Sequence, residues 1–249
     1  MIWGSDRSVE GIRRLRARPD ANDIVFPART SLLVISRGAL ENLDLRSVAR
    51  RIAQDVSVFE QKACASPHCL FLETADRQVV ERIAEELAGA MLAALRRLPK
   101  VAPSEEEVAA ILELRARYDI LHRAWYSEGT EFTILADDLV QLGPAVGNRT
   151  IYLRCVDDLE RVAELITAKV QTVGLIATPG EYGRLSERFG RAGVQRFARV
   201  GAMTHFESPW DGVMIPQQMV RWTSRLRHDA TSGEPMTPLV GLPSAPQHT

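Results

Sequence analysis

Short apolar runs alternate with amphipathic segments along most of the chain, and this alternation constrains the fold more than any other feature. We predict strands in the short apolar runs, at residues 23–26, 31–36, 70–73, 131–135, 150–154, 172–177 and 196–200. We predict helices in the amphipathic segments, at residues 8–18, 45–58, 77–98, 104–126, 159–170 and 181–192. Such alternation is typical of an α/β fold with a largely parallel sheet. From Thr231 onward the chain is rich in Pro, Ser, Thr and Gly, and we predict a disordered tail.

The charge balance and the cysteine count exclude several classes of protein. The 249 residues carry 31 basic and 32 acidic side chains, so the formal charge of -1 gives no electrostatic reason to expect a nucleic acid or an anionic membrane as partner. No window approaches the ~20 apolar residues of a membrane span, and the N-terminus lacks the apolar core of a signal peptide. Three cysteines do not make a disulfide framework, so we predict a reducing, cytoplasmic location.

One cysteine lies where thiol chemistry can be done. Cys64 is placed in a short polar turn between a helical segment and the apolar run that begins at Leu70. At such a turn, backbone N–H groups can lower the pKa of a thiol and can hold the oxyanion of an attacked carbonyl. A buried structural cysteine more often lies within an apolar run, as Cys155 does between Leu153 and Val156. We therefore predict that Cys64 is a nucleophile.

The neighbours of Cys64 each have two interpretations. His68 could polarise the thiol or could be a half-exposed turn residue, and we favour the turn residue. Glu60 and Gln61 are expected to shape the turn or contact substrate rather than transfer protons. Lys62 could keep the thiolate charged or could face solvent.

A metal site is disfavoured by the spacing of the possible ligands. Cys64, His68 and Cys69 lie close together, but zinc sites need a second pair of ligands elsewhere. Cys155 and His205 could complete such a site, and neither has a second ligand nearby in the sequence. We predict no metal.

The N-terminal segment has the features of the middle of a larger unit. Trp3, Gly4 and Ser5 form a strand end and a turn before a helix, yet the chain has no G-x-G-x-x-G motif. Gly4 and Ser5 are candidates to approach a cofactor phosphate, because the first N–H groups of a helix favour anions. The alternative is a simple helix cap.

Four segments, in order, resemble the C-terminal half of the LuxC-type acyl-CoA reductases, which are distant members of the aldehyde dehydrogenase superfamily that make fatty aldehydes and are best known from bacterial luminescence. The segments are Trp3-Gly4-Ser5-Asp6, residues 25–31 (VFPARTS), residues 61–67 (QKACASP), and residues 200–222 with Val200-Gly201-Ala202-Met203, Ser208-Pro209-Trp210-Asp211-Gly212 and Val220-Arg221-Trp222. The resemblance implies an aldehyde dehydrogenase-like catalytic domain with the last part of a Rossmann-type cofactor domain. It divides the chain into a partial nucleotide-binding domain (1–45), a thiol-bearing domain (46–200), a C-terminal signature segment (201–228) and a tail (229–249).

The resemblance also implies a reaction. Cys64 would attack a long-chain acyl-CoA or acyl-protein thioester, with its own backbone N–H as one oxyanion donor, and NADPH would reduce the acyl-enzyme to a fatty aldehyde. NADPH rather than NADH is implied only by the family. In hydrolytic aldehyde dehydrogenases a glutamate activates water against the acyl-enzyme, and Phe26 takes its approximate place here. No chemical role follows for Asp211, which the resemblance places in a turn near the active site.

Family members are longer than this chain, and three interpretations follow. The chain could be a fragment of a working reductase, or one half of a split enzyme that assembles with a partner protein. It could also be a non-catalytic interaction or acyl-binding module. A binding module unrelated to dehydrogenases predicts that Cys64 is no more reactive than Cys155. An unfinished sheet edge predicts pairing, including a homo-oligomer.

Overall fold

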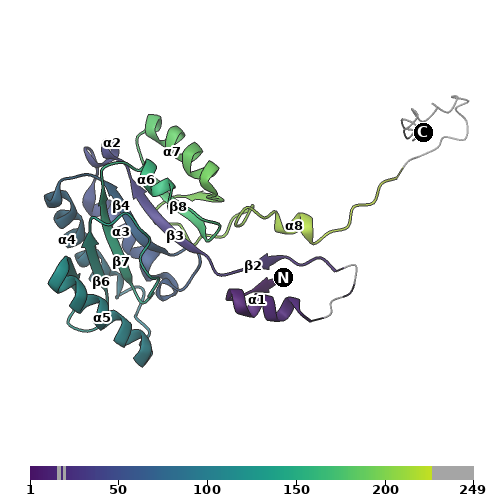
Figure 1. The fold of residues 1–249 in the computed structure, drawn as a ribbon, viewed down its shortest axis with the longest axis horizontal. Coiled ribbons are helices and arrows are strands. Elements are labelled where there is room, and N and C mark those ends of the chain that lie inside the picture. Colours follow the sequence, from purple (N-terminus) through teal and green to yellow (C-terminus); the bar gives the residue numbers. More distant parts are fainter. Residues whose placement is uncertain (16–17, 19–20, 226–249) are drawn as a thin grey trace, which may run out of the picture.

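The computed structural model describes residues 1–15, 18 and 21–225, and most of them build one large sheet between two layers of helices (Figure 1). The sheet has seven strands in the order β5-β6-β7-β4-β3-β8-β9. All neighbouring strands are parallel except β5, which is antiparallel to β6. The strands are β3 (Thr30–Ile35), β4 (Pro67–Glu73), β5 (Arg123–Tyr126), β6 (Thr133–Asp137), β7 (Thr150–Val156), β8 (Val170–Ile176) and β9 (Arg196–Ala198). The predicted parallel α/β fold is confirmed.

The central strands are apolar on both faces because helices cover both faces of the sheet. In β3, Leu33 and Ile35 face one core and Leu32 and Val34 face the other. The first core lies under α3 (Leu45–Ser57) and α4 (Arg77–Ala94). The second lies under α5 (Glu105–Leu121), α6 (Glu160–Ala163) and α7 (Pro179–Ala192). A short helix, α2 (Arg37–Leu40), follows β3.

Capping side chains set where the longer helices begin. Asp44 accepts a hydrogen bond from the Ser47 N–H (3.1 Å) at the start of α3, and Asp76 accepts one from the Gln78 N–H (2.8 Å) at the start of α4. Ser104 and Glu107 form a capping box at α5.

A small N-terminal unit lies beside the large sheet (Figure 1). Strand β1 (Ile2–Trp3) pairs in parallel with β2 (Val25–Phe26), and α1 (Asp6–Arg13) lies between them in the chain. The Trp3 and Phe26 rings stack with their centroids 4.6 Å apart. A small apolar cluster joins this unit to the turn at Cys64 and to the segment that precedes and begins α8 (Ile215–Gln218); its buried members are Ile24, Phe26, Ala65, Trp210 and Ile215.

Several predicted boundaries differ from the structure. The predicted helix 104–126 ends at Leu121, and residues 123–126 form β5, where aromatic residues favour pairing with β6. The predicted helix 159–170 is a single turn, α6, because the chain turns at Thr167 to enter β8. Helix 77–98 ends at Ala94, and turns continue to Leu98. The predicted tail from Thr231 onward lies outside the described residues, as does part of the predicted helix 8–18.

The expected domain boundary at residue 45 places β3 with the nucleotide-binding part. In the structure β3 is a central strand of the large sheet, between β4 and β8, because it is buried on both faces. We therefore propose that the partial cofactor unit ends before Thr30 and that the thiol-bearing domain begins there.

Candidate active site

Cys64 lies in a turn immediately before β4, at the end of the large sheet where the parallel strands begin. The thiol-bearing residue is half-buried. The hydroxyl of Ser31, in β3, donates a hydrogen bond to the Cys64 carbonyl (2.7 Å), and the Ser66 N–H donates to the Ala63 carbonyl (2.9 Å). The turn is therefore fastened both to itself and to the neighbouring central strand.

The residues that lead into this turn have an unusual backbone. Phe59, Glu60 and Gln61 have φ values of 54°, 52° and 60°, all in the left-handed region. They belong to the short 3₁₀ segment η1 (Val58–Gln61). For residues other than glycine this conformation costs about 1–2 kcal/mol each. It persists only where the surroundings hold it, and such strain is concentrated at functional sites.

The hydrogen bonds of the Gln61 side chain help to keep these residues in the left-handed conformation. Its amide nitrogen donates to the Pro67 carbonyl (2.7 Å) and to the Thr150 carbonyl (2.8 Å), and its amide oxygen accepts from the Thr150 N–H (2.8 Å). These bonds tie the turn to the first residues of β4 and β7. Gln61 is buried, so each bond is shielded from water.

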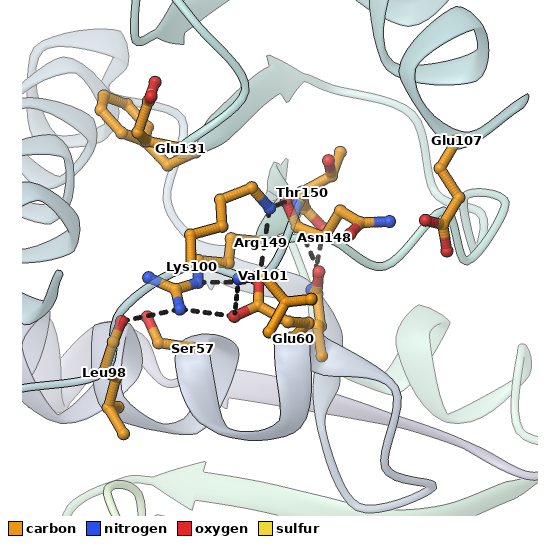
Figure 2. Close-up of polar contacts among 12 residues, drawn as sticks. Ser57, Glu60, Leu98, Lys100, Val101, Glu107, Glu131, Asn148, Arg149 and Thr150 are labelled. Carbon is orange, nitrogen blue, oxygen red and sulfur yellow. Dashed lines mark hydrogen bonds and ion pairs between the residues drawn. The ribbon is translucent and has the colours of Figure 1, made fainter. Parts of the chain in front are cut away.

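The Glu60 side chain also holds this turn in place, through a buried ion-pair cluster (Figure 2). Its carboxylate accepts two hydrogen bonds from Arg149, Nη2–Oε1 at 2.7 Å and Nε–Oε2 at 3.2 Å. Lys100 Nζ lies 3.3 Å from the same carboxylate, and Arg149 also donates to the Leu98 carbonyl (2.9 Å). Glu60 and Gln61 therefore shape the turn, which was the first of the two roles expected for them.

Two residues that the sequence analysis did not select as functional lie beside the thiol. The side chain of Gln171, in β8, lies close enough to Cys64 to lower the pKa of its thiol, and it donates to the carboxylate of Asp211. Gln171 is fully buried, and Asp211 is nearly so. A polar residue within the apolar run of β8 was the available signal for Gln171. Asp211 had been predicted near the active site without a role.

Electrostatics at the thiol differ from the prediction of a lowered pKa. Burial raises the pKa of Cys64, and the charge of Asp211 raises it further; hydrogen bonds from Gln171 and the Ala65 backbone offset only part of this rise. Burial also raises the pKa of Asp211 to about 6, against the influence of Arg196, Arg29 and Gln171. The cost of burying a thiolate therefore exceeds the benefit of the donors around it.

Two predicted neighbours of the thiol have other roles. Lys62 forms an ion pair with Glu107 of α5 (2.7 Å). His68 was expected as a half-exposed turn residue; it is instead buried within β4, and burial lowers its pKa to about 4, so it is neutral at pH 7.

The other two cysteines lie within strands. Cys69 is buried in β4 and Cys155 is half-buried in β7, and burial raises the pKa of both. Within residues 1–15, 18 and 21–225, no three His, Cys, Asp or Glu side chains are grouped so that they could hold a metal ion. In the same part of the chain, no helix has the length and apolar character needed to cross a membrane.

Gly4 and Ser5 lie at the exposed N-terminus of α1. Ser5 is the helix cap, and its hydroxyl accepts a hydrogen bond from the Ser8 N–H (3.1 Å). A Cβ on Gly4 would lie 3.2 Å from the Ser8 Cβ, so the absence of a side chain keeps this end of the helix open. The capping role is observed. The open helix end fits a cofactor phosphate, which stays a prediction.

Solved structures with a similar fold include aldehyde dehydrogenases and proline utilization A proteins. A proline utilization A variant from Bradyrhizobium japonicum matches with a TM-score of 0.61 and 18% identity, over 81% of this chain and 22% of that one. An NAD-dependent aldehyde dehydrogenase from Burkholderia multivorans matches with a TM-score of 0.52 and 16% identity, over 70% and 37%. A putative methylmalonate-semialdehyde dehydrogenase from Sinorhizobium meliloti, complexed with NAD, matches with a TM-score of 0.50 and 11% identity, over 71% and 40%.

This chain therefore spans between about a fifth and two fifths of the length of these structures. A search of curated protein sequences finds no significant match. The model of the acyl-CoA reductase (LuxC) family matches residues 1–222, which is nearly all of the described chain. The chain has the aldehyde dehydrogenase fold and belongs to the LuxC family of acyl-CoA reductases.

Proposed function

We propose that this chain carries the thiol-bearing part of an oxidoreductase that reduces a long-chain acyl-CoA to a fatty aldehyde with NADPH. The observation that carries the proposal is the position of Cys64. Its thiol lies at the end of the sheet where the parallel strands begin and where the strained turn, Gln171 of β8 and Asp211 meet, whereas Cys69 and Cys155 lie within strands. Family membership supports the substrate class.

The proposed first step is transfer of the acyl group to Cys64. The sulfur attacks the thioester carbon, a new C–S bond forms, and the bond to the coenzyme A sulfur breaks. The proton of the Cys64 thiol ends on the coenzyme A thiolate, so charge and protons balance. The Cys64 backbone N–H is the proposed oxyanion donor.

Gln171 and Asp211 are proposed to prepare the thiol. Asp211 is next to it and carries a carboxylate at neutral pH, since its pKa is about 6. We assign it the temporary acceptance of the thiol proton. Gln171 donates to Asp211 and lowers the pKa of Cys64, so we assign it the roles of positioning the Asp211 carboxylate near the thiol and of stabilising the thiolate. Both are positioned before substrate arrives.

NADPH, when bound, supplies the hydride that reduces the acyl group to an aldehyde. Gly4 and Ser5 would meet its phosphates at the N-terminus of α1. By the family resemblance, Phe26 takes the approximate place of the base of a hydrolytic enzyme, and in the structure its ring is buried and stacked on Trp3. A side chain of this kind cannot activate water, which protects the thioester on Cys64 from hydrolysis.

The proposal is tested by single-turnover reduction. The purified chain is incubated with a long-chain acyl-CoA, freed of excess substrate, and given NADPH or NADH while released aldehyde is trapped with a hydrazine. Aldehyde from wild type with NADPH, and none from Cys64→Ala, is the expected result. An acyl adduct that neither cofactor reduces would instead support the acyl-carrying part of a split enzyme. Equal results for Cys64→Ala and wild type would refute the role of Cys64.

A further inference from the structure

Residues that precede Asp211 in the chain line a hollow on the surface of the protein. It is a groove of about 700 Å³ between α3, the C-terminal part of α4 and residues 199–205. Five basic side chains line it: Arg50 and Arg51 of α3, Arg97 after α4, Arg199 and His205. No acidic residue is among those that line the groove.

The side chains of these arginines are exposed. Within residues 1–15, 18 and 21–225, none of Arg50, Arg97 and Arg199 forms an ion pair, although many other arginines of the chain do. The nearby carboxylate of Asp55 is buried and accepts hydrogen bonds from the Gly201 N–H (2.5 Å) and the Met203 N–H (3.0 Å). Asp55 therefore holds residues 201–203, which form part of one wall of the groove, against α3. Its carboxylate points to these backbone groups, so the arginines leave the opening of the groove positively charged.

Small residues line the groove between the arginines. Ala90, Ala93 and Ala94 of α4 contribute an apolar lining. The wall approaches α3 so closely that a Cβ on Gly201 would lie 3.0 Å from the Arg51 Cβ, and the φ of Gly201 is 93°. An apolar lining with guanidinium groups around it suits a ligand that combines an aromatic base with phosphates.

The groove is connected to the candidate active site through its wall. Arg196 donates to the carbonyls of Met203 (2.8 Å) and His205 (3.0 Å), and its charge also lowers the pKa of Asp211. The same segment therefore lines the groove at His205 and reaches the thiol at Asp211. On the other side, Val58 lines the groove and begins the turn that leads to Cys64.

We propose that this groove binds the phosphorylated adenosine diphosphate of coenzyme A. The inference rests on the proposed function for the identity of this ligand, and the phosphates of NADPH stay assigned to the N-terminus of α1. The volume lies in the range of small-molecule sites, about 300–1,000 Å³. Arginine binds phosphate oxygens through paired N–H donors, and four arginines around one groove supply several such pairs.

The test compares binding with thiol acylation. Calorimetry measures the Kd of coenzyme A, NADPH and inorganic pyrophosphate for wild type, Arg50→Gln/Arg199→Gln and the control Arg46→Gln. Arg46 is an exposed arginine of the same helix that does not line the groove. We expect the double variant to weaken coenzyme A binding at least 10-fold and the control to leave it unchanged. A double variant that loses NADPH binding and keeps coenzyme A binding would overturn the assignment to coenzyme A.

Acylation of Cys64 then separates this inference from the proposed function. If coenzyme A binds in the groove, the double variant slows acylation by acyl-CoA at least 10-fold and leaves acylation by acyl-pantetheine, which lacks the nucleotide, unchanged. Unchanged nucleotide binding, or equal losses in the control, would overturn the groove while acylation still supports the proposed function. Loss of acylation by both thioesters in wild type, with nucleotide binding intact, would refute the proposed function alone. If the double variant differs from wild type only in its oligomeric state, the groove is an interface between subunits, and the inference is overturned.

Discussion

Replacing Arg149 by methionine tests whether the buried ion pair holds the cysteine turn. The Arg149 side chain is 1% exposed and that of Glu60 11% exposed, with a closest N–O distance of 2.7 Å. Arg149→Met keeps the volume and leaves the Glu60 carboxylate buried. Removal of one partner from a buried pair costs about 3–5 kcal/mol of the free energy of unfolding. Because Lys100 stays 3.3 Å from the carboxylate, we expect the lower end, about 3 kcal/mol.

The assay is urea unfolding followed by circular dichroism. With a denaturant slope of about 2–3 kcal/mol/M, the loss moves the midpoint down by about 1–1.5 M. Arg184→Met is the matched control, because Arg184 pairs with Glu160 at a distance of 2.5 Å but is 53% exposed. Its expected cost is at most about 1 kcal/mol.

A double variant identifies the cause of the loss. Arg149→Met/Glu60→Gln removes the stranded carboxylate as well as the arginine, so it should be more stable than Arg149→Met alone. A cost for Arg149→Met no larger than that of Arg184→Met would refute the reasoning. A double variant less stable than Arg149→Met would show that the charge on Glu60 is not the cause.

Other expected outcomes follow from single contacts. Gly174→Ala places a Cβ 2.4 Å from the Leu33 side chain, so thermal unfolding should show a loss of about 1–3 kcal/mol; Gly183→Ala, in α7 with open space around it, should be neutral or stabilising. Gln171→Leu removes a group that stabilises the thiolate, so the rate of Cys64 acylation, measured in quenched time courses, should fall about 10- to 100-fold. An unchanged rate would contradict the positioning role of Gln171. Alkylation of Cys64 by iodoacetamide should still accelerate above pH 9, since its pKa is raised. Asp211→Asn removes a charge that raises this pKa, so the same profile should shift to lower pH.

The sheet and its helices could be predicted because their signals are local. Leu32, Leu33, Val34 and Ile35 form a continuous apolar run, and such a run between helical segments fits only a strand covered on both faces. The position of Cys64 in a turn before a strand was likewise predictable from the polar residues around it. Residues 123–126 were not predicted as a strand, since their pairing with β6 depends on tertiary contact.

The surroundings of the thiol could not be predicted, because they come from distant parts of the chain. Gln171 follows Cys64 by more than a hundred residues, and only the β3–β8 pairing brings it to the same edge of the sheet. Asp211 lies in the segment that follows β9, and its charge acts on the same thiol. The raised pKa of Cys64 follows from burial, which the polar sequence of the turn does not indicate. The left-handed backbone of Phe59, a bulky residue, also has no local sequence signal.

The central claim is that Cys64, and no other cysteine, accepts the acyl group. Wild type, Cys64→Ala and Cys155→Ala are incubated with a long-chain acyl-CoA at pH 8, and intact mass is measured before and after hydroxylamine. The account predicts one hydroxylamine-sensitive adduct on wild type and Cys155→Ala, located on the peptide that contains Cys64, and none on Cys64→Ala. An equal adduct on folded Cys64→Ala, or no adduct on any of the three, would contradict it.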